Sequence, residues 1–186
     1  RSINLSMGFV EATQSGLENI NNLIQNAKEK ATQGADDSLG SEDRLAIAQE
    51  VEGIMDEIIT QLNGKFDGEN LFSGTNTDIA DAYQFDENSA QQFIYNGNNQ
   101  QISQKFGEYL ELSINITDEE INAEDILTKL YLLKTQLESN NGSGNGYWDS
   151  GEEFIDSDSN GSWDPGEEFT DIGVDDFIDE MDSLSE

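Results

Sequence analysis

Residues 10–31 read VEATQSGLENINNLIQNAKEKA, and this stretch decides the fold. Apolar or small residues recur at alternating steps of three and four, at Val10, Thr13, Leu17, Ile20, Ile24, Ala27 and Ala31. Such a repeat is typical of a helix that packs one side against other helices. It predicts one long helix over residues 3–33, and a fold based on helix packing.

A second helix is predicted after the short acidic and glycine-containing linker at 34–40. Ser41 is a suitable N-cap, and Glu42 and Asp43 would lie in the first turn, where carboxylates favour the helix dipole. Apolar residues then follow on one side, at Ile47, Val51, Ile54, Ile58 and Leu62. Because the linker is short, the two helices should form an antiparallel pair.

After Asn63-Gly64 the apolar period changes from about 3.5 to about 2, which indicates strands. Short strands are expected at 83–85, at 93–95 and around Leu110, Leu112 and Ile114. Asn96-Gly97 is a strong signal for a hairpin turn. Residues 65–115 are therefore predicted to form a small antiparallel sheet.

Helical periodicity returns towards the end of the chain. Thr117-Asp-Glu-Glu120 resembles a capping box, and a helix is predicted at 123–139. Its apolar stripe consists of Ile126, Leu130, Leu133 and Leu137. The segment 173–186 carries a second heptad-spaced set, Val174, Phe177, Met181 and Leu184. We expect this segment to be a return helix that completes the bundle.

The composition limits the possible partners. The 186 residues include 40 acidic and 8 basic ones, so the formal charge is −32. Nucleic acids and anionic membranes are poor partners, because little positive charge could neutralise their phosphates. There is no Cys and no His, and no apolar run approaches the roughly 18 residues of a membrane span. No nucleophile elbow, phosphate loop or catalytic triad is visible, so we expect no enzyme.

The sharpest local chemistry is a calcium motif at 156–167. The sequence DSDSNGSWDPGE fills every required position of the loop D-x-[DN]-x-[DN]-G-x5-E. Ca2+ needs six to eight oxygen ligands, which such a loop supplies from a short segment. The predicted ligands are Asp156, Asp158, Asn160, Ser162 through its carbonyl, Asp164 and Glu167.

This loop is one of two copies that are 15 residues apart. The first copy would bind through Asn141, Ser143, Asn145, Tyr147 through its carbonyl, Asp149 and Glu152, and Asp171 repeats the position of Asp156. The first copy has fewer carboxylates, so its affinity should be lower. The alternative is an acidic linker that matches by chance, but the phased Trp148 and Trp163 argue against it. Bound Ca2+ would order this acidic region, because metal binding is coupled to folding.

A longer pattern carries a family resemblance. It joins three segments in order: Leu17-x-x-Ile20-Asn-Asn-Leu23-Ile24-x-x-Ala27, Glu42-Asp43-Arg44-x-x-Ile47-Ala48, and Leu62-Asn63-x-Lys65-Phe66-x-Gly68-x-x-Leu71-Phe72-Ser73-Gly74-Thr75. This pattern resembles the flagellin superfamily, and its last segment is most similar to the hook-associated junction proteins. Flagellins proper usually carry Phe-Asn-Gly and then Leu-Leu-Asp-Gly there. The hairpin residues 93–98 and the helix at 126–137 fit the same family.

The resemblance implies a mainly α fold with a small antiparallel β element: an elongated antiparallel helical bundle like the D1 part of flagellin. Residues 1–139 would form this bundle with its β region at 65–115, and 173–186 would be the return helix. The calcium repeat at 140–172 is not part of the family's pattern, and we expect it to be an insertion between two helices. The implied partners are copies of itself, a hook-side junction protein and filament flagellin. The implied location is the extracellular flagellum, at the hook–filament junction.

Two observations concern the ends of the chain. The resemblance implies export through the flagellar secretion channel without a cleaved signal peptide. The chain opens Arg1-Ser2-Ile3 without Met or an apolar signal-peptide core, which agrees with that expectation. The long terminal helices of the family are absent or cut short, so we expect a piece of a longer protein. Two other readings stay open: a filament flagellin, and a secreted calcium-binding module whose helices only present the loops.

Overall fold

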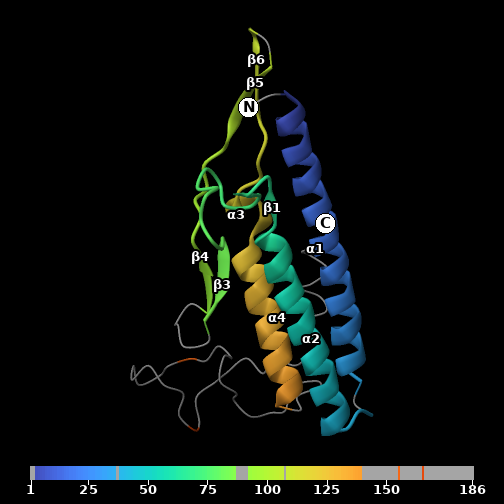
Figure 1. The fold of residues 1–186 in the computed structure, drawn as a ribbon. Helices are drawn as coiled ribbons and strands as arrows, with labels where there is room; N and C mark the ends of the chain where they lie inside the picture. Colours follow the sequence, from blue (N-terminus) through green and yellow to red (C-terminus); the bar gives the residue numbers. More distant parts are fainter. Residues whose placement is uncertain are drawn as a thin grey trace. The chain divides into compact units, whose positions relative to one another are not determined.

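A computed structural model describes residues 3–36, 38–86, 92–106 and 108–139, together with the single residues 155 and 165. The chain divides into two compact units: residues 1–26 with 53–129 form unit 1, and residues 27–52 with 130–186 form unit 2. The helices are α1 (Ile3–Gly34), α2 (Ser41–Leu62), α3 (Asp118–Ile121) and α4 (Ala123–Glu138) (Figure 1). The strands are β1 (Lys65–Phe66), β2 (Glu69–Asn70), β3 (Tyr83–Phe85), β4 (Phe93–Tyr95), β5 (Ser103–Phe106) and β6 (Leu110–Ser113).

The two long predicted helices are confirmed almost to the residue. Their connection differs in one detail, because α2 begins at Ser41 itself. The Gly40 carbonyl accepts hydrogen bonds from the amides of Asp43 and Arg44, each at 3.1 Å. Gly40 is therefore the N-cap residue, and the prediction of Ser41 is wrong by one position. Glycine is a tolerated N-cap, so Ser41 is free to form the first helical turn.

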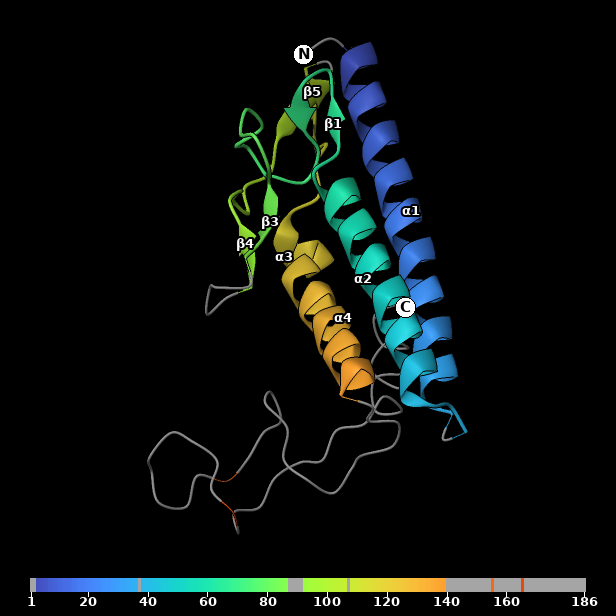
Figure 2. The same ribbon diagram turned by 60° about the horizontal axis from the view of Figure 1, so that its bottom comes forward.

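In its described residues, 27–52 and 130–139 apart from 37, unit 2 consists of three helix segments packed together. Its core joins the end of α1, the start of α2 and the end of α4, through Ala31, Ile47, Ala48, Val51, Leu133 and Leu137. In both views α2 lies between α1 and α4, and successive helices run in opposite directions (Figures 1 and 2). The predicted antiparallel pairing is thus confirmed for this unit. The heptad residues of α1 and α4 are buried here because each faces α2.

Ion pairs surround this core. Lys30 pairs with Glu50, and Lys134 lies 3.0 Å from the Glu138 carboxylate and 3.6 Å from that of Glu52. Partial burial lowers the pKa of Lys134, but these two carboxylates outweigh it and hold the pKa above its usual range. Because exposed ion pairs each contribute about 1 kcal/mol or less, the apolar core supplies most of the stability.

Unit 1 contains the β region, which is arranged differently from the prediction. Its six strands form three separate antiparallel pairs, β1–β2, β3–β4 and β5–β6, and not one sheet. Asn96-Gly97 follows β4 and is not a hairpin turn, because β4 pairs with β3 and the next strand, β5, pairs with β6. The Asn96 amide instead extends the pairing by donating to the Ala82 carbonyl at 2.8 Å. The turn prediction is therefore wrong, although the strands on which it rested are confirmed.

The predicted capping box precedes α3. The amide and the hydroxyl of Thr117 both donate to the Glu120 carboxylate at 2.9 Å. These two hydrogen bonds lower the pKa of Glu120. Asn122, with a φ of 56°, then separates α3 from α4. The predicted helix at 123–139 is confirmed as α4, and its stripe residues are all buried.

Candidate assembly surface

Two phenylalanines attach the start of the β region to α1. Phe66 lies over Gly8, where an added Cβ would be 2.5 Å from the ring carbon Cζ. Phe72 lies over Gly16 in the same way, at 3.0 Å, and is fully buried. Because glycine has no side chain, the two aromatic rings can pack directly against the backbone of α1 at these positions. These contacts place the Phe66–Phe72 segment against the first half of α1.

Two asparagines then fix the chain that follows. The Asn63 side chain bonds both backbone groups of Tyr83, donating to its carbonyl and accepting from its amide, each at 2.8 Å. The buried Asn70 amide donates to the carbonyls of Thr77 and Ile79, at 3.1 and 2.6 Å. These two side chains make hydrogen bonds to the backbone that a longer sheet would otherwise supply. The loops of this region are therefore held in place although its strands are short.

Gly74 and Asn98 form a close clasp between two distant loops. Gly74 has a φ of +65°, and a Cβ there would lie 1.8 Å from the Asn98 carbonyl oxygen. The Asn98 amide donates to the Ser73 carbonyl at 3.1 Å. Its Oδ1 accepts from the amides of Thr75 and Gln100, at 3.1 and 3.0 Å. The Leu71–Thr75 segment is therefore locked onto the segment that follows β4.

Two tyrosines of the β3–β4 pair stack with ring centroids 4.8 Å apart. The Tyr83 hydroxyl donates to the Asp118 carboxylate at 2.7 Å. Burial, followed by this carboxylate, raises the pKa of Tyr83 far above its ordinary value. Burial also raises the pKa of Tyr95 to about 12. Both phenols therefore stay protonated at neutral pH and act as structural donors, not as acids or bases.

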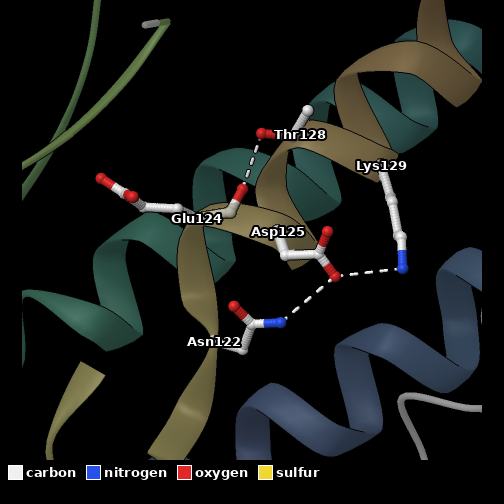
Figure 3. A network of polar contacts seen from close by, with 5 residues as sticks. All are labelled: Asn122, Glu124, Asp125, Thr128 and Lys129. Carbon is white, nitrogen blue, oxygen red and sulfur yellow. Dashed lines mark hydrogen bonds and ion pairs between the residues drawn. The ribbon is translucent and has the colours of Figure 1, made fainter. Parts of the chain in front are cut away.

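A network of polar contacts lies at the start of α4 (Figure 3). The Asp125 carboxylate accepts from the Asn122 side chain at 3.3 Å and pairs with the Lys129 ammonium at 3.0 Å. The Thr128 hydroxyl donates to the Glu124 carbonyl at 2.7 Å. Carboxylates in the first turn favour the helix dipole, and an i,i+4 ion pair adds a few tenths of a kcal/mol. This cluster is accounted for by helix formation and needs no catalytic role.

One stripe of exposed residues on α1 in unit 1 is apolar. Ile3 and Met7 are each 54% exposed and Val10 is 43% exposed, while Leu17 is half-buried. The predicted heptad stripe thus divides, because Thr13, Ile20 and Ala27 are buried and Val10 is not. Two hollows of about 190 and 270 Å³ lie along this side and share Val10. This exposed stripe with its hollows is the candidate assembly surface.

The predicted calcium ligands lie outside the described residues, as does the predicted return helix at 173–186. These are Asn141, Ser143, Asn145, Tyr147, Asp149, Glu152, Asp156, Asp158, Asn160, Ser162, Asp164, Glu167 and Asp171. Within residues 3–139, apart from the short gaps, no group of acidic side chains is arranged to hold a metal. In the same part of the chain no helix is long and apolar enough to cross a membrane.

Arg44 has a structural role that the sequence pattern does not reveal. It is only 5% exposed, although it lies in the first turn of α2. Its Nε donates to the Gly34 carbonyl at 3.1 Å, and one terminal nitrogen donates to the Asp36 carbonyl at 3.0 Å. It therefore caps the carbonyl of Gly34, the last residue of α1, where a cation also favours the helix dipole. Its bond to Asp36 holds the linker that follows α1. The short linker between α1 and α2 is the sequence feature that points to this role, because it brings the start of α2 close to the end of α1.

Comparison with known proteins supports the resemblance inferred from the sequence. Residues 1–77 match the family model of the bacterial flagellin N-terminal helical region. A structure described as a flagellar hook-associated protein of Vibrio parahaemolyticus is similar, with a TM-score of 0.64 and 23% identity, over 73% of this chain and 60% of that one. No curated protein matches the chain.

Two further structures are similar over 63% of this chain, each at 24% identity. They are FlgL of Xanthomonas campestris, with a TM-score of 0.58 and 38% of its own chain covered, and hook-associated protein 3 of Legionella pneumophila, with 0.56 and 36%. The chain thus spans less than two thirds of the length of each of the three structures. At these identities the likeness establishes the fold, which is that of flagellar hook-associated proteins.

Proposed function

We propose that the chain is a structural part of the bacterial flagellum that links the hook to the filament through subunit–subunit contacts. Its partners are copies of itself, a hook-side junction protein and filament flagellin. Its location is the extracellular junction, and it has no catalytic role. The proposal goes beyond the fold, because one fold serves many functions.

The observation that carries this proposal is the Leu71–Thr75 segment. It is the part of the sequence that is most similar to junction proteins and differs from flagellins proper. In the structure this segment is not a free loop, since Phe72 is buried over Gly16 of α1 and Gly74 contacts Asn98. The distinguishing sequence is therefore part of the packed unit from which an assembly surface is built.

Location in the intact flagellum tests the proposal. Gold-labelled antibodies against residues 1–139 should mark only the point where hook and filament meet in electron micrographs. Label along the whole filament would instead identify a filament flagellin. Label away from the flagellum would favour a secreted calcium-binding module. A variant that lacks residues 140–172 should keep its location, because the proposed junction contacts lie in the helical part.

We also propose that residues 140–172 are an insertion that Ca2+ folds, with the stronger site at 156–167. The support is the complete ligand pattern and the phased Trp163 within it. In this view the ion neutralises a region that has acidic residues and no Lys or Arg from Glu138 to the end. The ion is structural and does not act as a sensor, because assembly and not Ca2+ response is the proposed function.

Adding Ca2+ to the metal-free chain should change Trp163 fluorescence and stabilise the fold of the insertion. Because Ca2+ would bind only the folded form, it should raise the free energy of unfolding by about 2.7 kcal/mol when its concentration is 100 times Kd. Glu167→Gln should weaken binding at least tenfold, since the last ligand of such a loop is bidentate. Asp179→Asn removes one charge outside the loop and should leave the titration unchanged. Lack of any response at millimolar Ca2+ would refute the site.

A further inference from the structure

Asn-Gly pairs are among the chemically least stable parts of a protein chain, because the glycine nitrogen can attack the asparagine side chain without hindrance from a Cβ. The described residues contain two such pairs, Asn63-Gly64 and Asn96-Gly97. The attack needs a side-chain amide that can reach the next residue and a glycine N–H that is not held in a hydrogen bond. The surroundings of each pair therefore decide whether it can react.

Asn63-Gly64 is held on both sides of the bond that would form. The Asn63 side chain donates to the Tyr83 carbonyl and accepts from the Tyr83 amide, each at 2.8 Å, so its Cγ is fixed in place. The Gly64 amide donates to the Gln61 carbonyl at 2.9 Å. Attack would break all three hydrogen bonds, so this pair can react only when the region opens locally.

Asn96-Gly97 follows directly after β4 and is much less restrained (Figure 1). Asn96 is exposed, and its side chain donates to the Asp81 carbonyl at 3.4 Å, a distance typical of a weak hydrogen bond. Within the described part of the chain the Gly97 amide has no hydrogen-bond acceptor. Both reacting groups are therefore available in the folded chain.

The packing around Tyr95 explains why glycine follows Asn96. A Cβ at Gly97 would lie 2.4 Å from the Tyr95 ring, whose hydroxyl donates to the Asn98 carbonyl at 3.1 Å. No larger residue fits at position 97 unless this tyrosine moves. The fold thus requires the glycine that makes Asn96 reactive.

We propose that Asn96 is a site of spontaneous covalent modification, by deamidation to aspartate and isoaspartate with water as the co-reactant. The Gly97 nitrogen loses its proton to a base and bonds to Cγ of Asn96, while the bond from Cγ to Nδ2 breaks and ammonia leaves with a proton. Water then opens the five-membered imide. Opening at Cγ gives aspartate, whereas opening at the main-chain carbonyl gives isoaspartate, whose main chain runs through the former side chain. No group is oxidised or reduced.

The isoaspartate product should loosen the clasp between Asn98 and the Leu71–Thr75 segment. It adds one carbon to the main chain just before Asn98, whose Oδ1 accepts from the Thr75 amide at 3.1 Å. It also displaces the Asn96 carbonyl, which accepts from the Asn76 side chain at 3.3 Å. The inference goes beyond the proposed function and does not rest on it, because it concerns the chemistry of the folded chain alone.

Peptide mapping by mass spectrometry tests the proposal on the full chain. The chain is incubated in mildly alkaline buffer, and conversion is followed at Asn96 and Asn63. In the folded chain Asn96 should react roughly tenfold faster or more, because Asn63 reacts only from locally opened states. In urea the two sites should react at similar rates, since both are Asn-Gly pairs. The proposal is overturned if Asn96 is not converted, if Asn63 reacts as fast in the folded chain, or if the difference persists in urea.

Two variants separate the modification from its structural effect. Asn96→Gln has a longer side chain that cyclises far more slowly, and Asn96→Asp carries the product's charge on an ordinary main chain. After incubation, hydrogen exchange at the amides of Thr75 and Asn98 should become several-fold faster in the original chain, in proportion to its isoaspartate content. It should stay unchanged in equally incubated Asn96→Gln and in freshly prepared Asn96→Asp. Equal exchange in the aged original chain and in Asn96→Gln would refute the effect on the clasp. None of these outcomes depends on the flagellar location, which the antibody experiment tests separately.

Discussion

Replacing Gly74 by alanine should lower the free energy of unfolding by about 3 kcal/mol or more, the largest effect that we expect from one added methyl group. The left-handed backbone alone costs a residue with a Cβ about 1–2 kcal/mol. The new carbon would also lie 1.8 Å from the Asn98 carbonyl oxygen and 2.5 Å from its Oδ1. Backbone atoms cannot rotate away, so Asn98 must move and give up hydrogen bonds worth about 1 kcal/mol each.

Gly68 provides a matched control for this prediction. Its φ is +82°, but an added Cβ would meet nothing within 4 Å. Gly68→Ala therefore incurs the backbone cost of about 1–2 kcal/mol without the collision. Urea denaturation followed by circular dichroism would compare the two variants. Equal losses would show that Asn98 moves freely, and the clasp would then have no part in holding the Leu71–Thr75 segment.

The sequence predicted the helices well because their signal is local. Each heptad stripe extends over several turns, so a single exceptional residue does not hide it. Both long helices also end where glycine or Asn63-Gly64 interrupts the pattern. Strands could be located by alternation at 83–85 and 93–95. Their partners could not, because strand pairing depends on contacts between distant residues. Asn63 and Asn70, whose side chains bond the backbone of another loop, give no periodic signal.

The candidate assembly surface could be predicted only in part. Val10 and Leu17 share the heptad repeat with Ile24 and Ala31, but only the latter two are buried. A repeat shows that a helix packs, and it does not show which side meets which neighbour. Ile3 and Met7 continue the exposed stripe, and their surroundings depend on where β5 and β6 lie. The calcium loop is the opposite case, because its ligands are adjacent in sequence and their pattern can be recognised without any fold.

Arg44→Ala should lower the stability of unit 2 by about 3 kcal/mol. A hydrogen bond from a charged group contributes about 1.5–3 kcal/mol. Arg44 donates such bonds to the carbonyls of Gly34 and Asp36, from a position that is only 5% exposed. Alanine would leave the carbonyl of Gly34, at the end of α1, and that of Asp36, in the linker, without this donor. The loss should appear in urea denaturation and as faster hydrogen exchange in the last turns of α1.

Two control variants separate the possible causes of this loss. Arg44→Lys keeps the charge but lacks the planar fork that reaches two carbonyls, so it should recover roughly half of the lost stability. Leu45→Ala changes the next residue, which is 46% exposed, and should cost much less, about 0.5 kcal/mol. Full recovery by lysine would mean that charge near the helix end is sufficient. An effect of Arg44→Ala no larger than that of Leu45→Ala would contradict the capping role, and the α1–α2 connection would then depend on its apolar contacts alone.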